Sequence, residues 1–460
     1  MAGTAQEQTY SYVRPSALTF ADGRADLLLA TSGGRTAAGP AAHPVFFDGF
    51  LGHPEQAAAA LLAVAKVART RFYLPPGMVA AILRAADPVV TSNGDRLRFE
   101  SFSACCGVYA RYDALPGSLD GSVLDAGTTN VDFNPPMRDA LARVGGLEPL
   151  HLQVGEDVVV STLDGAVTEK KVPLPERWLK GFAEVQLASA TVAPVFEVPA
   201  SEARRFVRSM PSSGSRKPVW VVPAGRGLRL TTRPTPEGVS LSGPDRLKPL
   251  EPLLRFARSL RGYAAPHDPH GATGLWELEL DDARLVLVLS PESSRGFSGE
   301  GGVLWDLAGE ESADDADLVS ALLAFEPRID IATLAADAGL PEDRITRALG
   351  RLGAAGRVGF DAAEGAYFHR ELPYDPDRLA AMHPRLRDAQ ALLDADAVRL
   401  DGGSVAHVRS GEVEHVVRRT ESGDRCTCQW FAKHQASRGP CKHILAADLA
   451  RSRAGWTPTS

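Results

Sequence analysis

The spacing of apolar and polar residues predicts helices and strands that alternate along most of the chain. Residues 55–69 contain no Gly or Pro and are apolar on nearly every side, and they follow Pro54, which predicts a buried helix. Further helices are expected at 201–210 and 252–260. The expected strands lie at 97–102, 219–222, 228–230, 275–280 and 285–289.

Residues 317–371 show a different pattern, in which short helices precede a hairpin. Apolar spacing predicts helices at 317–325, 331–338 and 342–354. Two short strands flank residues 361–365 as a hairpin. Three helices and a β-hairpin in this order resemble a winged helix.

The third of these helices carries the basic residues that a recognition helix needs. Arg344, Arg347 and Arg351 lie on one face, where they offer donors for phosphates and guanine edges. Glu342 and Asp343, however, occupy the end of the helix where base contacts are normally made. Docking of a protein is therefore the alternative role for this segment.

The chain is long enough for several domains. Its 460 residues suggest roughly three domains of about 150 residues each, and the clearest linker begins at Pro211. We expect an α+β multidomain protein with mixed α/β blocks in its N-terminal and middle parts. The expected units are a flexible N-terminal arm at 1–42, an N-terminal α+β domain at 43–211, a middle α+β domain at 217–308, a winged-helix-like domain at 317–371, a helical connector at 373–403 and a C-terminal module at 404–452.

Composition is that of an ordinary globular protein, with 44% hydrophobic and 23% charged residues. Fifty basic and 57 acidic residues give a net charge of −7, which excludes a polybasic coat but not a local basic surface. The first residues do not resemble a secretory signal, and no apolar run reaches the ~20 residues of a membrane span. We therefore expect a cytoplasmic protein that does not enter a membrane.

Three of the five cysteines gather near the end of the chain. Cys426 and Cys428 are followed, after twelve residues, by Cys441 and then His443. Three thiolates and one imidazole form a complete tetrahedral donor set for zinc. A closed set favours a structural ion, because catalytic zinc usually keeps one position for water. We therefore predict one structural Zn²⁺ on these four residues, with His434 of the spacer as the alternative ligand.

The surrounding residues predict a small ββα unit. Strands at 413–419 and 425–428 form a hairpin, and residues 444–450 form an apolar helix. This layout and the pattern Cys-x-Cys, spacer, Cys-x-His resemble the SWIM zinc finger over roughly residues 410–452. The resemblance implies the same four ligands, and a unit this small takes much of its folding free energy from the metal.

The whole chain is also similar to bacterial SWIM zinc finger family proteins. The similar segments are residues 46–50, 105–109 and 127–134. Proteins of this kind look to be encoded beside MoxR-type AAA+ ATPases and von Willebrand A-domain proteins. The resemblance therefore implies a protein partner of one of these kinds within an assembly.

The C-terminal module carries a local excess of basic residues. Residues 404–460 contain nine Lys or Arg and five Asp or Glu. These residues suit either phosphate contacts, with Trp430 or Phe431 as a stacking surface, or an acidic protein surface. The candidate contact residues are Arg418, Arg419, Arg425, Lys433, Arg438 and Lys442, together with Arg344, Arg347 and Arg351 of the winged-helix-like segment.

Other polar motifs give weaker signals. The glycine-rich residues 296–302 lack the Lys-Ser/Thr of a P-loop, and no hydrolase or nucleophile motif occurs. Residues 127–134 either line a binding site or cap their own backbone. We therefore expect a protein without enzymatic activity, a zinc-binding adaptor whose finger mediates macromolecular interaction, most simply with a protein. Binding of DNA or another nucleic acid by the finger and the winged-helix-like segment is the alternative function.

Overall fold

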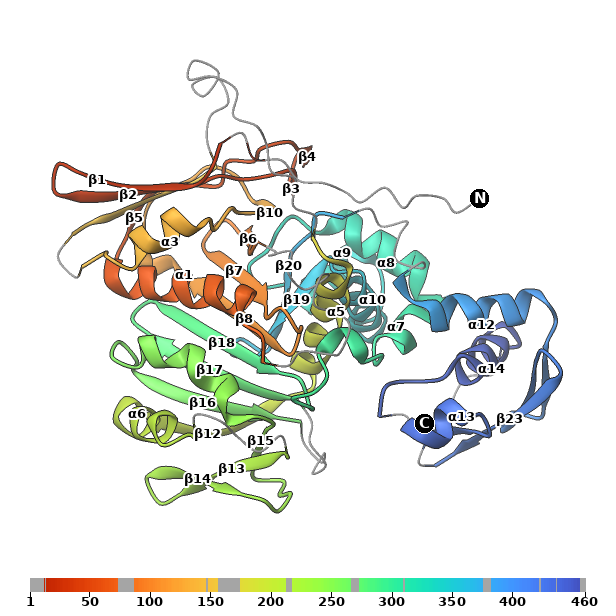
Figure 1. The fold of residues 1–460 in the computed structure, drawn as a ribbon. Helices are drawn as coiled ribbons and strands as arrows, with labels where there is room; N and C mark the ends of the chain where they lie inside the picture. Colours follow the sequence, from red (N-terminus) through yellow and green to blue (C-terminus); the bar gives the residue numbers. More distant parts are fainter. Residues whose placement is uncertain are drawn as a thin grey trace.

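Helices and several separate sheets make up the computed structural model of this chain (Figure 1). It describes residues 12, 14–72, 87–145, 148–155, 174–211, 217–265, 273–308, 311–374, 382–421, 423–435 and 437–455. The large sheets lie on one side of the molecule and the C-terminal module on the other, with helices between them. The predicted α+β multidomain class is confirmed.

A five-stranded sheet lies near the N-terminus. Its order is β1 (Ala17–Ala21), β2 (Arg24–Leu29), β11 (Leu150–Val154), β5 (Phe47–Leu51) and β9 (Leu119–Val123). β2 and β11 are parallel, and the other neighbours are antiparallel. The predicted flexible arm over 1–42 is wrong for its described part, because Ala25, Leu27 and Leu29 alternate into the core as in any half-buried strand.

A ten-stranded antiparallel sheet joins the first and middle parts of the chain. Its order is β12 (Ala193–Pro199), β16 (Ser259–Ala264), β17 (Gly274–Leu280), β18 (Ala283–Leu289), β8 (Val108–Ala114), β7 (Leu97–Phe102), β6 (Val89–Ser92), β10 (Gly127–Asn130), β3 (Gly34–Thr36) and β4 (Gly39–Ala41). β18 pairs with β8 along its whole length. The domains predicted at 43–211 and 217–308 therefore share one sheet, since the composition of a linker does not show which strands pair across it.

Helices and a small sheet cover these strands. α1 (Pro54–Arg69) packs on β7 and β8, and α3 (Pro135–Leu141) lies against α1. α6 (Ala200–Arg208) packs against β14 of the three-stranded sheet β14 (Gly227–Thr231), β13 (Val219–Ala224) and β15 (Val239–Leu241). Short 3₁₀ helices are η1 (Pro116–Ser118), η2 (Pro244–Leu253) and η3 (Phe297–Gly299).

The helix predicted at 252–260 is wrong. The 3₁₀ helix η2 ends at Leu253, and Ser259 already begins strand β16. Pro249 and Pro252 lie inside η2, and neither has the N–H that a continuing α-helix requires.

The predicted three helices and hairpin are present in residues 311–371. They are α8 (Glu311–Leu322), α9 (Ile331–Ala338), α10 (Glu342–Ala354), β19 (Val358–Asp361) and β20 (Ala366–His369). α10 is packed on several sides, because it contacts α5 (Glu176–Ala190), α7 (Leu304–Ala308) and α8. Ile345 and Leu349 are fully buried in this contact region.

A buried ion cluster holds the hairpin of this unit against the ten-stranded sheet. Asp361 of β19 lies 2.7 Å from Arg284 of β18 and 3.1 Å from Arg111 of β8. Arg111 also lies 2.9 Å from Asp113, and Arg98 of β7 contacts both carboxylates. The five side chains are at most 8% exposed. The hairpin is therefore a fixed part of the protein interior.

The C-terminal module is a separate sheet with three neighbouring helices. The sheet has the order β21 (Val398–Asp401), β22 (Val405–Ser410), β23 (Val413–Thr420) and β24 (Gly423–Cys426). The helices are α12 (Pro384–Asp394), α13 (Gln429–His434) and α14 (Lys442–Arg453), and α14 packs on α12 and α7. β21 lies in the predicted connector at 373–403, so the sheet of the module begins before residue 404.

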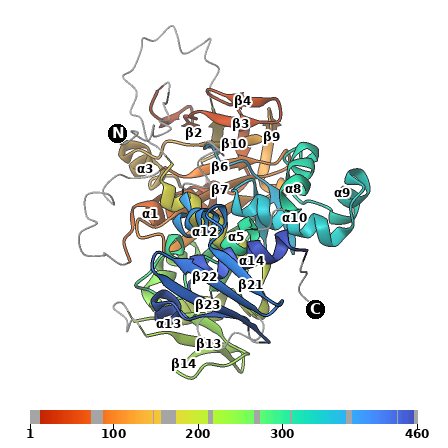
Figure 2. The same ribbon diagram turned by 90° about the vertical axis from the view of Figure 1, so that its right-hand side faces the viewer.

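The module also has a distinct position in the molecule. In Figure 2 its sheet lies nearest the viewer, in front of the large sheets. None of the described helices combines the length and hydropathy that a membrane crossing requires.

Candidate metal centre

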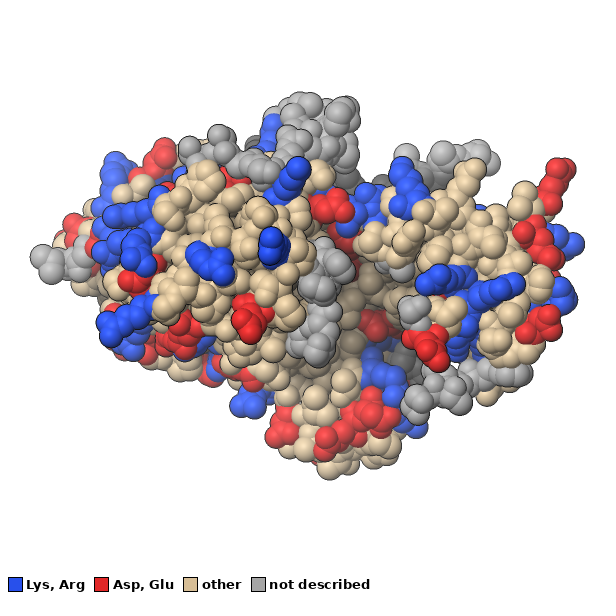
Figure 3. Space-filling model, turned by 90° about the horizontal axis from the view of Figure 1, so that it is seen from below, with Lys and Arg blue, Asp and Glu red and all other residues tan. Residues whose placement is uncertain are grey.

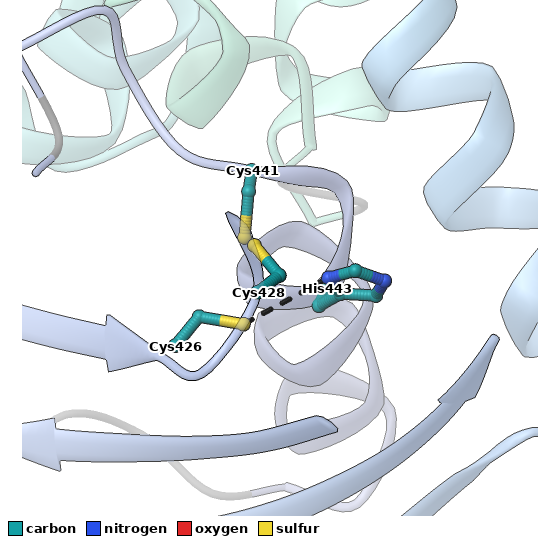
Figure 4. A group of neighbouring side chains, drawn as sticks. All are labelled: Cys426, Cys428, Cys441 and His443. Atoms are coloured by element: carbon teal, nitrogen blue, oxygen red, sulfur yellow. Dashed lines mark hydrogen bonds between the residues drawn. The ribbon is translucent and has the colours of Figure 1, made fainter. Parts of the chain in front are cut away.

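Four side chains from three neighbouring segments converge in the C-terminal module (Figure 4). Cys426 ends β24, Cys428 immediately precedes α13, Cys441 immediately precedes α14, and His443 lies in the first turn of α14. Their ligand atoms all lie within 4.8 Å of one another. The hairpin and the two helix starts therefore bring together residues that are separated by up to 17 positions.

The spacing of these atoms fits a zinc ion. The Sγ atom of Cys426 lies 3.8 Å from Nδ1 of His443. A tetrahedral zinc site with metal–sulfur bonds of about 2.3 Å and a metal–nitrogen bond of about 2.0 Å places sulfur and nitrogen about 3.5 Å apart, close to this distance. All four side chains are buried, with exposed fractions of 2–7%. Thiolate and imidazole donors in this arrangement would hold Zn²⁺ as a structural ion, with all four positions filled by protein.

Backbone N–H groups stabilise the negative charge that the thiols must carry. Phe431 N donates to Sγ of Cys428 at 3.4 Å, and Ile444 N donates to Sγ of Cys441 at 3.5 Å. Both cysteines thus cap the N-terminus of a helix, where the helix dipole favours an anion. The pKa of Cys441 is lowered, chiefly because the Cys426 thiol donates a hydrogen bond to it. The pKa of Cys426 is raised because this thiol keeps the shared proton.

Two other histidines lie near the cluster without joining it. The ring of His415 contacts the ring of His443, with 4.2 Å between their centres. His434, the alternative ligand, packs instead on Trp430 at 4.9 Å. The cluster found among the described residues contains His443 and not His434.

Comparison with known families agrees with this geometry. Residues 415–450 match the sequence model of the SWIM zinc finger. Residues 415–450 of the C-terminal module are a SWIM zinc finger. No curated protein matches the chain. Among solved structures, the proliferating cellular nuclear antigen of Entamoeba histolytica is 7% identical, with a TM-score of 0.33, over 54% of this chain and 99% of that one. A TM-score this low does not establish a shared fold.

The basic residues predicted to contact a partner fall into two groups on the SWIM finger. Arg418 and Arg425 are exposed and face each other across β23 and β24, and Lys433 is exposed on α13. Arg419 is instead bound to Asp424 and Asp448. Arg438 and Lys442 are half-buried. The exposed group is available to a partner, whereas Arg419 ties the hairpin to α14.

The winged-helix-like arginines are engaged within the chain. Arg344 donates to Asp315 at 2.8 Å, Arg347 lies 2.9 Å from Asp343, and Arg351 donates to the carbonyl of Leu307 at 3.0 Å. Residues 311–371 contain twelve acidic and six basic residues, so this unit repels phosphate. These pairings reduce the positive charge that α10 offers to phosphate, and a partner contact by its arginines stays a prediction.

Arg385 connects the SWIM finger to the rest of the protein. Its guanidinium donates to the carbonyl oxygens of Arg438 (2.6 Å), Pro440 (2.9 Å) and Glu300 (3.0 Å). It also lies over the ring of Trp430, 4.9 Å from its centre, so this indole is already covered on one face. Trp430 is therefore a weaker stacking surface than the sequence suggests.

The glycine-rich residues 296–302 have a packing role in the same region. A Cβ atom on Gly439 would overlap the backbone of Gly301. A Cβ atom on Gly301 would in turn overlap Arg385. These glycines allow the loop before Cys441 to lie directly on the loop before α7.

The remaining polar motif, residues 127–134, bonds to the backbone of the N-terminal segment and begins α3. Thr129 donates to the carbonyl of Ser32 at 2.8 Å, and Asp132 accepts from the N–H of Ser16 at 3.0 Å. Asn134 accepts from Met137 N at 3.0 Å and so begins α3. Asn134 thus caps a helix as one of the two sequence interpretations expects, whereas Thr129 and Asp132 hold the N-terminal segment instead of their own backbone.

Proposed function

We propose that the protein is a non-catalytic adaptor that uses its zinc-stabilised SWIM finger to hold a partner protein. The proposal is carried by the side chains on one face of the finger's sheet, the face that points away from the metal centre. We call it the outer face. The alternation of the strands places on this outer face Arg399, Asp401, Val405, His407, Arg409, Glu414, Val416, Arg418 and Arg425.

The composition of the outer face is typical of a protein interface. Val405 and Val416 are half-buried near its centre. Four exposed arginines surround them, and none has an ion pair with another described residue. An apolar centre with an arginine-rich rim is the pattern that protein interfaces favour. Since arginines outnumber the exposed acids Asp401 and Glu414, the matching surface should be mainly acidic.

The metal centre supports a structural role for the ion. Its four protein donors leave no position for water or substrate, and catalytic zinc requires one. In the proposal the ion fixes the hairpin relative to α14, and the outer face then meets its partner as a rigid surface. The resemblance of the whole chain favours a MoxR-type AAA+ ATPase or a von Willebrand A-domain protein of the cytoplasm as that partner.

Nucleic-acid binding by the same face is the second candidate. Arg418 and Arg425 lie directly opposite each other on antiparallel strands, where two like charges repel. A phosphate group between them would relieve this repulsion. Nuclease distinguishes the two candidates, because it releases a nucleic-acid partner and leaves a protein partner bound.

The decisive experiment is affinity purification of the tagged full chain from its native host, with and without nuclease. The double variant Val416→Glu/Arg418→Glu changes the outer face, and Arg143→Glu/Arg328→Glu is a control with exposed arginines elsewhere. We expect an ATPase or another acidic protein to co-purify regardless of nuclease, and to be lost from the first variant alone. Retention of that protein by the outer-face variant, or its release by nuclease, would contradict the adaptor role.

A further inference from the structure

A second basic surface lies far from the SWIM finger in the sequence. Residues 200–258 contain twelve Lys or Arg and four Asp or Glu, a net charge of +8 in a chain whose total is −7. The remainder of the chain therefore carries −15. In the view from below (Figure 3), basic side chains gather at the left, the side on which Figure 1 places α6.

Four arginines of this region are exposed and form no ion pair with a described residue. Arg208 lies in the last turn of α6, and Arg226, Arg229 and Arg233 lie on or beside β14, which packs against α6. All four are exposed, and none has an ion pair with another described residue. We call these four residues the α6–β14 surface.

Other arginines of the region are neutralised within the chain. Arg205 is paired with Glu202, and Arg255 is paired with Glu55 at 2.6 Å. The positive charge of the α6–β14 surface is therefore not neutralised by ion pairs with other described residues. Four unpaired cations on two adjoining elements would each be stabilised by a phosphate of an extended polyanion that runs along them.

The chemistry of the surface favours a phosphate backbone over a protein. Leu230 is the exposed large apolar residue described there, and it points to the opposite face of β14 from Arg229. The surface thus lacks the apolar centre that a protein interface needs. Guanidinium groups bind phosphate oxygens in pairs, and the exposed hydroxyl of Thr232 offers a further donor.

We infer that the α6–β14 surface binds the phosphodiester backbone of a nucleic acid without reading its sequence. This inference does not depend on the adaptor role, because the two surfaces share no residue. The SWIM finger presents an apolar centre ringed by arginines, whereas the α6–β14 surface presents charge alone.

The test measures binding of the zinc-loaded full chain to fluorescent DNA and RNA oligonucleotides of arbitrary sequence, by anisotropy at several salt concentrations. The test variant replaces the four arginines of the α6–β14 surface by Ala. The matched control replaces Arg399, Arg409, Arg418 and Arg425 of the finger by Ala, which removes the same charge from equally exposed sites.

We expect the affinity of the wild type to fall steeply with salt, with a slope of log K against log salt of about −3 or steeper. The test variant should lose at least about tenfold in affinity and flatten that slope by about 3, whereas the control should keep both. Circular dichroism and zinc content should be unchanged in both variants. The inference is overturned if no oligonucleotide binds at low salt, if the control loses as much as the test variant, or if polyglutamate binds as tightly as the oligonucleotides.

Discussion

Replacing Arg385 with Ala should loosen the SWIM finger from the rest of the molecule while leaving its metal centre intact. Arg385 belongs to α12, but its three hydrogen bonds reach the loop before Cys441 and the carbonyl of Glu300. None of these acceptors is a metal ligand. The substitution therefore removes polar bonds that hold the finger in place and leaves both the donor set and the packing of α14 on α7.

The size of the effect follows from the contacts that are lost. Taking the net contribution of an ordinary hydrogen bond, about 1 kcal/mol, three bonds contribute about 3 kcal/mol. The contact of Arg385 with Trp430 adds about 0.5–1 kcal/mol. A loss of about 3.5–4 kcal/mol raises the population of the undocked finger roughly 400- to 900-fold.

Hydrogen exchange of the zinc-loaded full chain measures this population directly, because undocking exposes the amides of α14. Arg387→Ala is the matched control, since Arg387 lies on the same helix and is 63% exposed. Its ion pair among the described residues is with its neighbour Asp388. We expect faster exchange in α14 for Arg385→Ala and little change for Arg387→Ala. Equal exchange in the two variants would refute the reasoning, and loss of zinc from Arg385→Ala would show that the residue acts on the metal centre.

Three further predictions concern the donor set and two buried carboxylates. Cys441→Ser should abolish stoichiometric zinc binding in a metal assay, whereas His434→Ala should retain it; zinc loss from His434→Ala would contradict the assigned ligands. Burial raises the pKa of Glu184 from 4.5 to about 8, so the folded state holds this proton more tightly than the unfolded state and loses stability as the pH rises between those values. Glu184→Gln should therefore gain stability over the wild type as the pH increases, and denaturation midpoints that differ by a constant amount at pH 5 to 8 would disprove this. Asp361→Asn should destabilise the docked hairpin by about 3–5 kcal/mol, because Arg111 and Arg284 lose a buried partner; a change under about 1 kcal/mol in urea unfolding would contradict the role of the ion cluster.

Local features of this protein were predictable from its sequence, and long-range ones were not. The four zinc ligands follow from the types and spacing of Cys and His residues, whose chemistry admits few other uses. The three helices and the hairpin of residues 311–371 follow from apolar periodicity, which reports on neighbours along the chain. The pairing of β18 with β8 has no such local signal, so the shared sheet could not be predicted.

The partners of charged residues were likewise not predictable from the sequence. The basic spacing of Arg344 and Arg351 suggested phosphate contacts, but Asp315 and the carbonyl of Leu307 occupy them in the fold. The α6–β14 surface has no motif in the sequence, because its four arginines are spread over two elements without a regular spacing. A charge count over residues 200–258 is sufficient to find it, although only the structure shows which of its arginines are unpaired.

The pairing of β8 with β18, which are distant in the sequence, also limits when the large sheet can form during synthesis. β8 cannot pair with β18 until Ala283, the partner of Ala114 about 170 residues later in the chain, has been synthesised. At about 5–20 residues per second a ribosome needs roughly 10–35 seconds to produce that stretch. During that time the nascent chain carries an open, apolar strand edge, which is prone to aggregation until β18 emerges.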